Sequence, residues 1–190
     1  MISPYYNRPT QEGIYQHYKT VASQVSIPII VYNIPGRTGS KIEPETLARL
    51  AEIKNIAGVK EATGSVDQAI DVIRLCRDNL ALYSGEDTLT FSLMALGGKG
   101  VISTVANVAP REMSQLTEAC LNREWERGRD LQLKLTPLIR SLFIETNPIP
   151  VKTAVALMGK CTSELRLPLT AMADGNVQKL KQAMVEFGLK

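Results

Sequence analysis

The sequence contains a single histidine, His17, and only three cysteines, and these low counts exclude several kinds of site. Cys76, Cys120 and Cys161 are odd in number and far apart, so we expect reduced thiols in a cytoplasmic protein rather than a disulfide framework. Because neither a cysteine nor a second histidine lies near His17, a zinc site is not expected either.

Long apolar runs and clusters of one charge are also missing. No segment approaches the roughly 20 apolar residues of a membrane-spanning helix, and the first residues lack the basic and apolar regions of a signal peptide. The net charge is only +3, with basic and acidic residues interspersed. We therefore expect neither a membrane nor a nucleic acid as a partner. A chain of 190 residues that is 44% hydrophobic can bury an ample core.

What the sequence does contain is an alternation of strand and helix patterns. Continuous apolar, β-branched runs predict strands at residues 27–34, 56–60, 80–85 and 100–105. Helical periodicity predicts helices at residues 11–25, 44–51, 66–76, 87–96, 110–120, 123–143, 150–159 and 175–187. The strands recur about every 20 to 25 residues, each followed by a helix, which predicts right-handed βαβ units and a parallel sheet in an α/β fold.

Local signals mark where several of these elements begin. Thr10 is a predicted N-cap, and Ser65 and Gln68 have the spacing of a capping box. Asp87 is a third predicted helix cap. The segment 35–39, which contains one proline and two glycines, is predicted to be a loop.

Residues suited to chemistry gather where the predicted strands end. They are Tyr32, Arg37, Lys60, Thr63, Gly85, Glu86, Ser103 and Asn107. In a (β/α)8 barrel, this end of the strands carries the active site, and a complete barrel needs about 250 residues. The sequence therefore predicts about half of a (β/α)8 TIM barrel in residues 1–121 and a C-terminal helical region in residues 122–190.

Lys60 ends the second predicted strand, and Tyr32 ends the strand before it. Burial of Lys60 would favour its neutral amine, which can attack a carbonyl carbon, and a nearby phenol could transfer the protons that Schiff-base formation requires. The alternatives are a lysine whose amine reaches solvent from the strand end and a tyrosine that fills the core with its hydroxyl bonded to backbone.

Arg37 and Glu61 flank these two residues in the sequence. Arg37 lies in the loop between two glycines, and its planar guanidinium suits a carboxylate, although a solvated loop arginine is the alternative. Glu61 directly follows Lys60 and therefore points to the opposite side of the strand. We expect Glu61 to be structural and paired with an outer helix.

Five segments resemble one enzyme family. They are residues 4–9 (PYYNRP), 32–39 (YNIPGRTG), 58–64 (GVKEATG), 147–152 (NPIPVK) and 166–170 (RLPLT). Together, and in this order, they resemble the dihydrodipicolinate synthase family of lysine biosynthesis. The similarity extends over the whole chain and corresponds to about strands 5 to 8 of the family's barrel with their helices.

The resemblance implies a class I aldolase mechanism with no cofactor beyond a covalent Schiff base between lysine and pyruvate. Lys60 would form that Schiff base, and the derived enamine would attack L-aspartate 4-semialdehyde to give 4-hydroxy-tetrahydrodipicolinate in the diaminopimelate route. Tyr32 matches the family's proton donor and acceptor, and Arg37 matches the residue that receives the semialdehyde carboxylate.

Other positions match supporting parts of the family's site. Tyr6 matches a tyrosine that reaches across a dimer interface into the neighbouring proton relay, and the family's habit implies a homotetramer built as a dimer of dimers. Gly85 and Ile102 match positions that line the pyruvate pocket, Ile102 through its backbone. Lys152 fits a structural part of the helical region. Sialic acid lyase and related pyruvate-dependent aldolases share the lysine and tyrosine but not generally the arginine of this loop, and such an aldolase is an alternative.

The resemblance also implies that residues 1–190 do not include the first third of the family's chain, which precedes the segment 4–9. That third contains a threonine loop that binds the pyruvate carboxylate. Two hypotheses follow. In the first, the catalytic assignment holds, with a partner chain supplying the other strands. In the second, the chain is a catalytically inactive fragment that acts as an interaction unit and binds a synthase subunit or itself.

Overall fold

The structure is a computed structural model that describes residues 1–189. The chain forms two compact units, one from Met1 to Ile102 and one from Ser103 onward. The six residues that the family resemblance assigns to the site all lie in the first unit, whereas Ser103 and Asn107, which the strand pattern also suggested, lie in the second. We describe the two units separately.

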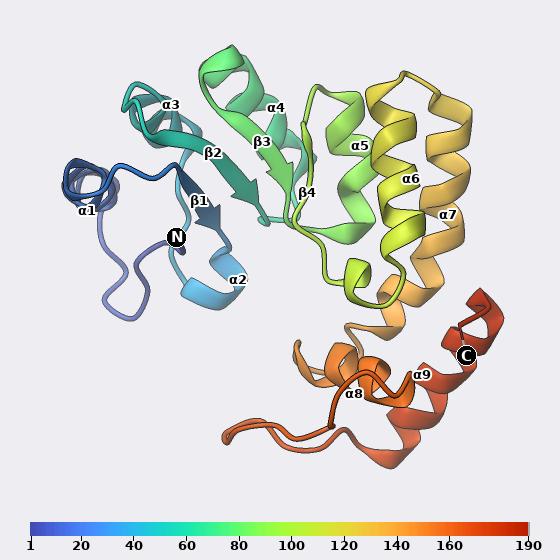
Figure 1. Ribbon diagram of the computed structural model, residues 1–190. Coiled ribbons are helices and arrows are strands. Elements are labelled where there is room, and N and C mark those ends of the chain that lie inside the picture. The colour runs from blue at the N-terminus through green and yellow to red at the C-terminus, as the bar shows by residue number, and fades with distance from the viewer. Residues whose placement is uncertain (190) are drawn as a thin grey trace. The chain divides into compact units, whose positions relative to one another are not determined.

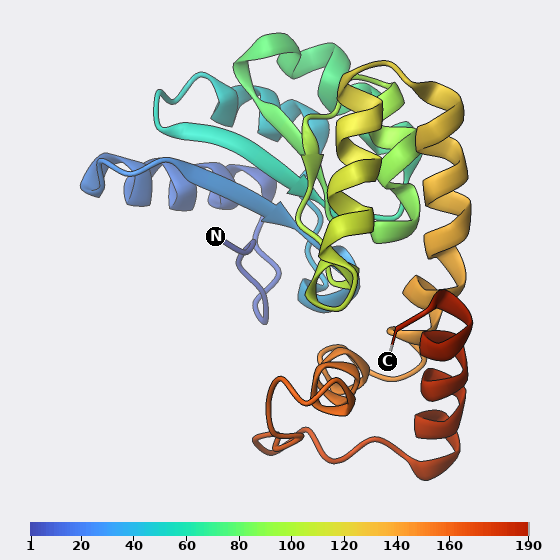
Figure 2. The same cartoon turned by 45° about the vertical axis from the view of Figure 1, so that its right-hand side comes forward.

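The first unit contains a four-stranded parallel sheet (Figure 1). In spatial order, the strands are β1 (Ile29–Asn33), β2 (Ile56–Glu61), β3 (Ala81–Ser84) and β4 (Gly100–Val101). This confirms the predicted strands and their parallel arrangement, except that β4 ends earlier than expected. Figures 1 and 2 both show the arrowheads of β1, β2 and β3 pointing toward one edge, where the predicted site residues are concentrated.

Helices connect these strands in the predicted order. They are α1 (Gln11–Gln24), α2 (Pro35–Thr38), α3 (Pro44–Ala51), α4 (Val66–Cys76) and α5 (Thr90–Ala95), with the 3-10 turns η1 (Arg77–Asn79) and η2 (Asp87–Leu89). Two N-terminal signals are confirmed: Thr10 Oγ1 accepts a hydrogen bond from the Gly13 N–H at 3.2 Å, and Ser65 Oγ accepts one from the Gln68 N–H at 3.1 Å.

Two local predictions were wrong. The segment expected to be a loop forms the single helical turn α2, because Pro35 presets the first helical φ and Gly39 ends the turn at φ 63°. Asp87 is not an N-cap but the first residue of η2, where its backbone carbonyl accepts a hydrogen bond from the Thr90 hydroxyl at 3.1 Å.

The core of the first unit lies on one face of the sheet. Alternate strand residues pack there against α1, α3 and α4. The fully buried side chains of this core include Ile14, Tyr18, Val31, Leu47, Leu50 and Val59. Because successive strand residues point to opposite faces, the other residues form a second face.

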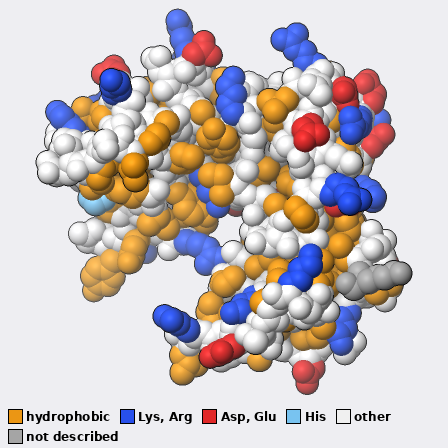
Figure 3. Space-filling view, viewed as in Figure 1, with side chains coloured by type: hydrophobic (Ala, Val, Ile, Leu, Met, Phe, Trp, Pro, Cys, Tyr) orange, Lys and Arg blue, Asp and Glu red, His pale blue; other side chains and the backbone are white. Residues whose placement is uncertain are grey.

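That second face is only partly buried. It carries Tyr32 of β1, Lys60 of β2 and Tyr83 of β3, all of intermediate exposure. The helices of the first unit pack on the other face of the sheet, so the described residues cover β2 on one face only. In Figure 3 apolar side chains are visible over β2 and β3.

The second unit is helical. It contains η3 (Val105–Asn107), α6 (Pro110–Leu121), α7 (Trp125–Ser141), α8 (Ile149–Leu157) and α9 (Asp174–Phe187). Helix α6 packs against α7, and both α7 and α8 pack against α9. The predicted helical region is thus confirmed, whereas the division at residue 121 stays a prediction. Within residues 1–189, no helix is long and apolar enough to cross a bilayer.

Candidate active site

Lys60 and Tyr32 lie side by side on the half-exposed face of the sheet. The parallel register of β1 and β2 pairs the two residues directly. The Lys60 Nζ lies 4.3 Å from the centroid of the Tyr32 ring. This distance places the amine over the aromatic face, in the geometry of a cation–π contact. The structure therefore brings together the two residues that the sequence predicts as one chemical unit.

The surroundings change the proton affinities of both groups. Burial lowers the pKa of the Lys60 amine, an effect that Asp87 and Glu86 oppose and that Arg37 adds to. Burial also raises the pKa of the Tyr32 hydroxyl. The charge of Arg37 lowers this pKa, and the charge of Glu86 raises it further. Lys60 thus loses its proton more readily than an exposed lysine, while Tyr32 keeps its own. A neutral amine beside a protonated phenol can attack a carbonyl and then transfer protons.

Arg37 approaches this pair from α2. Its charge acts on both Lys60 and Tyr32, so the guanidinium stands near the site. The backbone N–H of Arg37 donates to the Ile34 carbonyl at 3.0 Å. An arginine held on a short helical turn next to a reactive amine can receive the carboxylate of a bound molecule.

Gly85 lies directly against Lys60. Its N–H donates to the Glu61 carbonyl at 2.7 Å. A methyl group built at Gly85 would lie 2.6 Å from Ala62 Cβ and 3.1 Å from Lys60 Cγ. Only glycine leaves room for the Lys60 side chain at this position, so Gly85 shapes the site by having no side chain.

Ile102 and Tyr6 have different positions. The Ile102 N–H donates to the Ser84 carbonyl at 2.9 Å, which places Ile102 at the same sheet edge, next to Gly85. Tyr6 is 94% exposed and has a φ of 51°. This left-handed conformation is unusual for a bulky residue, and the side chain projects into solvent. The single chain therefore brings Lys60, Tyr32, Arg37, Gly85 and Ile102 to one sheet edge, but does not bring Tyr6 into the site.

Comparison with known proteins identifies the family to which this chain belongs. The sequence profile of the Dihydrodipicolinate synthetase family matches residues 1–186. The chain belongs to this family. It is 53% identical over 189 residues to 4-hydroxy-tetrahydrodipicolinate synthase of Geotalea uraniireducens. That match covers all of this chain and 65% of the relative, so the chain spans slightly less than two thirds of that relative's length.

Solved structures of family members agree with the fold. Dihydrodipicolinate synthase from Aquifex aeolicus superposes with a TM-score of 0.97 at 46% identity, covering 99% of this chain and 64% of the other. The chloride-inhibited enzyme from Acinetobacter baumannii, solved in complex with pyruvate, also gives 0.97, at 43% identity over 100% and 65% of the two chains. The predicted partial (β/α)8 barrel with a helical region is thereby confirmed.

The sequence prediction missed Asp87, whose charge acts on the Lys60 amine. Asp87 is 3% exposed. The charge of Asp87 raises the pKa of Lys60, and its effect is larger than that of the charge of the neighbouring Glu86. The available signal was an acidic pair directly after Gly85 at the end of β3. Because Asp87 also fitted a helix cap, this signal was ambiguous.

Glu61 is structural, but its predicted partner was wrong. Its carboxylate accepts hydrogen bonds from Asn33 Nδ2 at 3.0 Å and from the Thr63 N–H at 2.8 Å, rather than from an outer helix. Glu61 is 2% exposed, and burial raises its pKa. Asn33 had not been singled out in the sequence, since nothing local distinguishes a strand asparagine with a buried partner.

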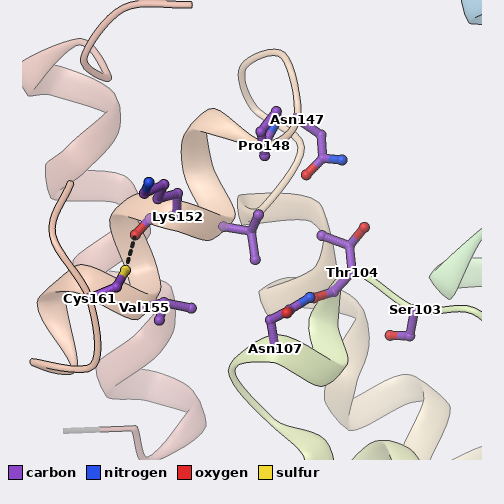
Figure 4. A pocket seen from close by; sticks show the side chains of 9 residues that line it. Ser103, Thr104, Asn107, Asn147, Pro148, Lys152, Val155 and Cys161 are labelled. Atoms are coloured by element: carbon purple, nitrogen blue, oxygen red, sulfur yellow. Dashed lines mark hydrogen bonds between the residues drawn. The ribbon is translucent and has the colours of Figure 1, made fainter. Parts of the chain in front are cut away.

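The helical unit has a cavity of its own, with a volume of about 370 Å³. Its lining residues include Ser103, Asn107, Asn147, Lys152 and Cys161 (Figure 4). In Figure 4 the amine of Lys152 points away from Ser103, while its backbone carbonyl accepts a hydrogen bond from Cys161 Sγ at 3.9 Å. The lysine of the 147–152 motif thus lies on α8 of the helical unit.

Proposed function

We propose that the chain forms 4-hydroxy-tetrahydrodipicolinate from pyruvate and L-aspartate 4-semialdehyde, through a Schiff base on Lys60. The observation that carries the proposal is the Lys60 amine, which lies 4.3 Å from the Tyr32 ring centroid in surroundings that lower its pKa. The named activity of the relatives supports it, as does the relative from Acinetobacter baumannii solved in complex with pyruvate.

The first step is attack by the neutral Lys60 amine on the ketone carbon of pyruvate. The carbinolamine that forms must then release the ketone oxygen as water, which requires one proton to reach that oxygen and another to leave the nitrogen. Tyr32 lies beside the amine and keeps its proton because burial raises its pKa. Its hydroxyl is therefore the group that donates and recovers these protons.

The second step joins the two substrates. Loss of a methyl proton from the Schiff base gives an enamine, whose carbon attacks the aldehyde carbon of the semialdehyde, and the aldehyde oxygen takes up a proton. The amino group that came with the semialdehyde then attacks the Schiff-base carbon, which closes the ring and releases the product as the bond to the Lys60 nitrogen breaks and the amine is recovered. Arg37 receives the semialdehyde carboxylate through a charge-assisted contact. This carboxylate contact favours the amino-acid substrate over the sugar-derived substrates of related aldolases.

The remaining parts of the proposal concern the pyruvate pocket and the assembly. Gly85 and the backbone of Ile102 line the pocket. Tyr6 contributes to the proton relay of a neighbouring subunit, which agrees with its 94% exposure in the single chain. We infer a homo-oligomer, built as a dimer of dimers, that acts in the cytoplasm.

The test is borohydride trapping with pyruvate, followed by peptide mapping. We expect a reduced pyruvate adduct on Lys60 in the parent chain and its loss in Lys60→Arg. Lys152→Ala is the matched control, because this motif lysine lies in the helical unit, and it should form the adduct at the parent rate. An adduct on other lysines only, or none on a folded chain, would contradict the proposed function.

A second candidate function follows from the sheet itself. Strand β4 is an outer strand of the described sheet, residues 1–3 pair with the outer edge of β1, and the second face of the sheet is half exposed. Such edges and faces can pair with another polypeptide. A folded chain that binds a synthase subunit or itself and forms no Lys60 adduct would be an interaction unit rather than an enzyme.

A further inference from the structure

A buried polar pair, Asn33 and Glu61, lies on the opposite face of the two strands that carry the site. The register that pairs Tyr32 with Lys60 pairs Asn33 with Glu61 one step later, and successive strand residues point to opposite faces. Asn33 has no exposed surface and Glu61 is 2% exposed. The chemistry described above uses neither side chain.

Asn33 closes the loop that carries Arg37. Its Nδ2 donates to the Ile42 carbonyl at 3.1 Å, and its Oδ1 accepts from the Ile42 N–H at 3.0 Å. The Asn33 amide thus bonds both backbone groups of Ile42 and joins the two ends of the segment 34–41. The Ile42 carbonyl also accepts a hydrogen bond from Gln68 Nε2 at 3.1 Å, so Asn33 alone holds the Ile42 N–H. We call these two hydrogen bonds the Asn33 clasp.

Glu61 determines which way the clasp amide faces. Its Oε2 accepts the second hydrogen of Asn33 Nδ2 at 3.0 Å, and its Oε1 accepts the Thr63 N–H at 2.8 Å. A carboxylate can only accept hydrogen bonds, so the Asn33 nitrogen must face Glu61 and its oxygen must face the Ile42 N–H. A flipped amide would turn its oxygen toward the carboxylate and lose both bonds to Ile42.

The clasped loop is packed as well as closed. Thr38 and Ser40 are both buried within it. The Thr38 hydroxyl lies 3.0 Å from the Ile34 carbonyl and 2.8 Å from the Ser40 carbonyl, which ties the middle of the loop to both sides. Because Arg37 precedes Thr38 directly, the position of its backbone depends on this closed segment.

We propose that Asn33, oriented by Glu61, is a positioning residue for Arg37: the clasp holds the loop so that the guanidinium receives the carboxylate of the second substrate. This inference rests on the proposed function and adds to it the residues that set recognition of the second substrate. Loss of the clasp should weaken use of the semialdehyde and leave Schiff-base formation with pyruvate largely intact, because the β1–β2 ladder holds Tyr32 against Lys60 independently.

The experiment compares Asn33→Ala, Arg37→Ala and the double variant with the parent. One readout is the rate of pyruvate trapping on Lys60. The other is the semialdehyde concentration, present with pyruvate before borohydride is added, at which half of the adduct then trapped on Lys60 is the heavier, condensed form. Gln11→Ala is the matched control. Gln11 bonds the Lys41 carbonyl at 2.8 Å, the Glu43 N–H at 3.0 Å and the Thr46 hydroxyl at 2.7 Å, which are groups next to the clasp and outside β1.

We expect Asn33→Ala to raise the half-converting concentration about 10-fold or more, the effect of losing a hydrogen bond to a charged group, with pyruvate trapping within about twofold of the parent. Arg37→Ala should show the same pattern, and Gln11→Ala should match the parent in both readouts. The double variant should be no worse than Arg37→Ala, because a residue that acts only through Arg37 has nothing left to position. Pyruvate trapping that falls as far as semialdehyde use, or a double variant that multiplies the two losses, would overturn the proposal.

Hydrogen exchange gives a readout that does not need turnover. Asn33→Ser keeps a hydroxyl that can donate to Glu61 but is too short to bond both backbone groups of Ile42, and it replaces Asn33→Ala if that variant does not fold. We expect the amides of residues 34–41 to exchange faster in either variant, with those of α3 unchanged. Equal exchange in that segment would refute the clasp. Absence of a pyruvate adduct in the parent would instead refute the proposed function.

Discussion

Replacing Gly85 by alanine inserts a methyl group where the structure leaves no room. The added carbon would lie 2.6 Å from Ala62 Cβ, 3.0 Å from the Glu61 carbonyl oxygen and 3.1 Å from Lys60 Cγ. Carbon atoms in contact are ordinarily about 3.5 to 4.0 Å apart, so the strand ends must separate by about 1 Å. Overpacking of this kind costs about 1 to 3 kcal/mol of unfolding free energy.

The same methyl group also displaces Lys60. A shift of about 1 Å in a reacting group can reduce a rate by about 100-fold. Lys60 can recover part of that shift by turning its flexible side chain. Borohydride trapping of pyruvate on Lys60 should therefore be at least about tenfold slower in Gly85→Ala, rather than the full 100-fold or so. Urea unfolding of the same sample measures the loss of stability separately.

Two other glycines provide the controls. At Gly58 an added methyl would lie 2.8 Å from the Ala81 carbonyl oxygen and 3.2 Å from the Tyr83 ring, so Gly58→Ala should lose similar stability without contacting Lys60. At Gly175, in the first turn of α9, the added atom meets nothing within 4 Å, so Gly175→Ala should leave trapping unchanged and should not lower the unfolding free energy, because alanine favours a helix over glycine. The reasoning is refuted if Gly85→Ala traps pyruvate at the parent rate, or if Gly58→Ala slows trapping equally.

Three further predictions concern the tyrosines and the lysine. Tyr32→Phe should slow pyruvate trapping by about 100-fold or more because it removes the group that transfers protons; a parent-like trapping rate would exclude Tyr32 from that role. The trapping rate should rise with pH and level off below the 10.5 of an ordinary lysine, because burial lowers the Lys60 pKa. Between the pKa of Lys60 in the folded chain and its higher pKa in the unfolded chain, the folded chain binds fewer protons than the unfolded chain. Lys60 therefore makes the urea midpoint rise with pH over that interval, and Lys60→Met should remove the rise. Tyr18→Phe removes the hydrogen bond that the hydroxyl of the buried Tyr18 donates to the Met1 carbonyl at 3.0 Å. Urea unfolding should show a loss of about 0.5 to 1.5 kcal/mol in the free energy of unfolding, and an unchanged midpoint would contradict this.

The sequence alone predicted the parts of the fold that depend on local pattern. Apolar runs and helical periodicity located the strands and most helices, and Thr10 and Ser65 marked helix starts that the structure confirms. The pairing of Lys60 with Tyr32 was also predictable, because parallel strands bring their carboxyl ends to one edge. The residue motifs were sufficient to indicate the family.

Other features depend on which distant residues become neighbours, and only the tertiary structure decided them. The half exposure of the Lys60 face arises because the described helices of the first unit pack on the other face of the sheet. The solvent position of Tyr6 follows from a left-handed backbone, and the need for glycine at Gly85 follows from its closeness to Lys60. Asn33 contacts Glu61 because β1 and β2 align in one register, a relation between residues 28 positions apart that no local pattern contains.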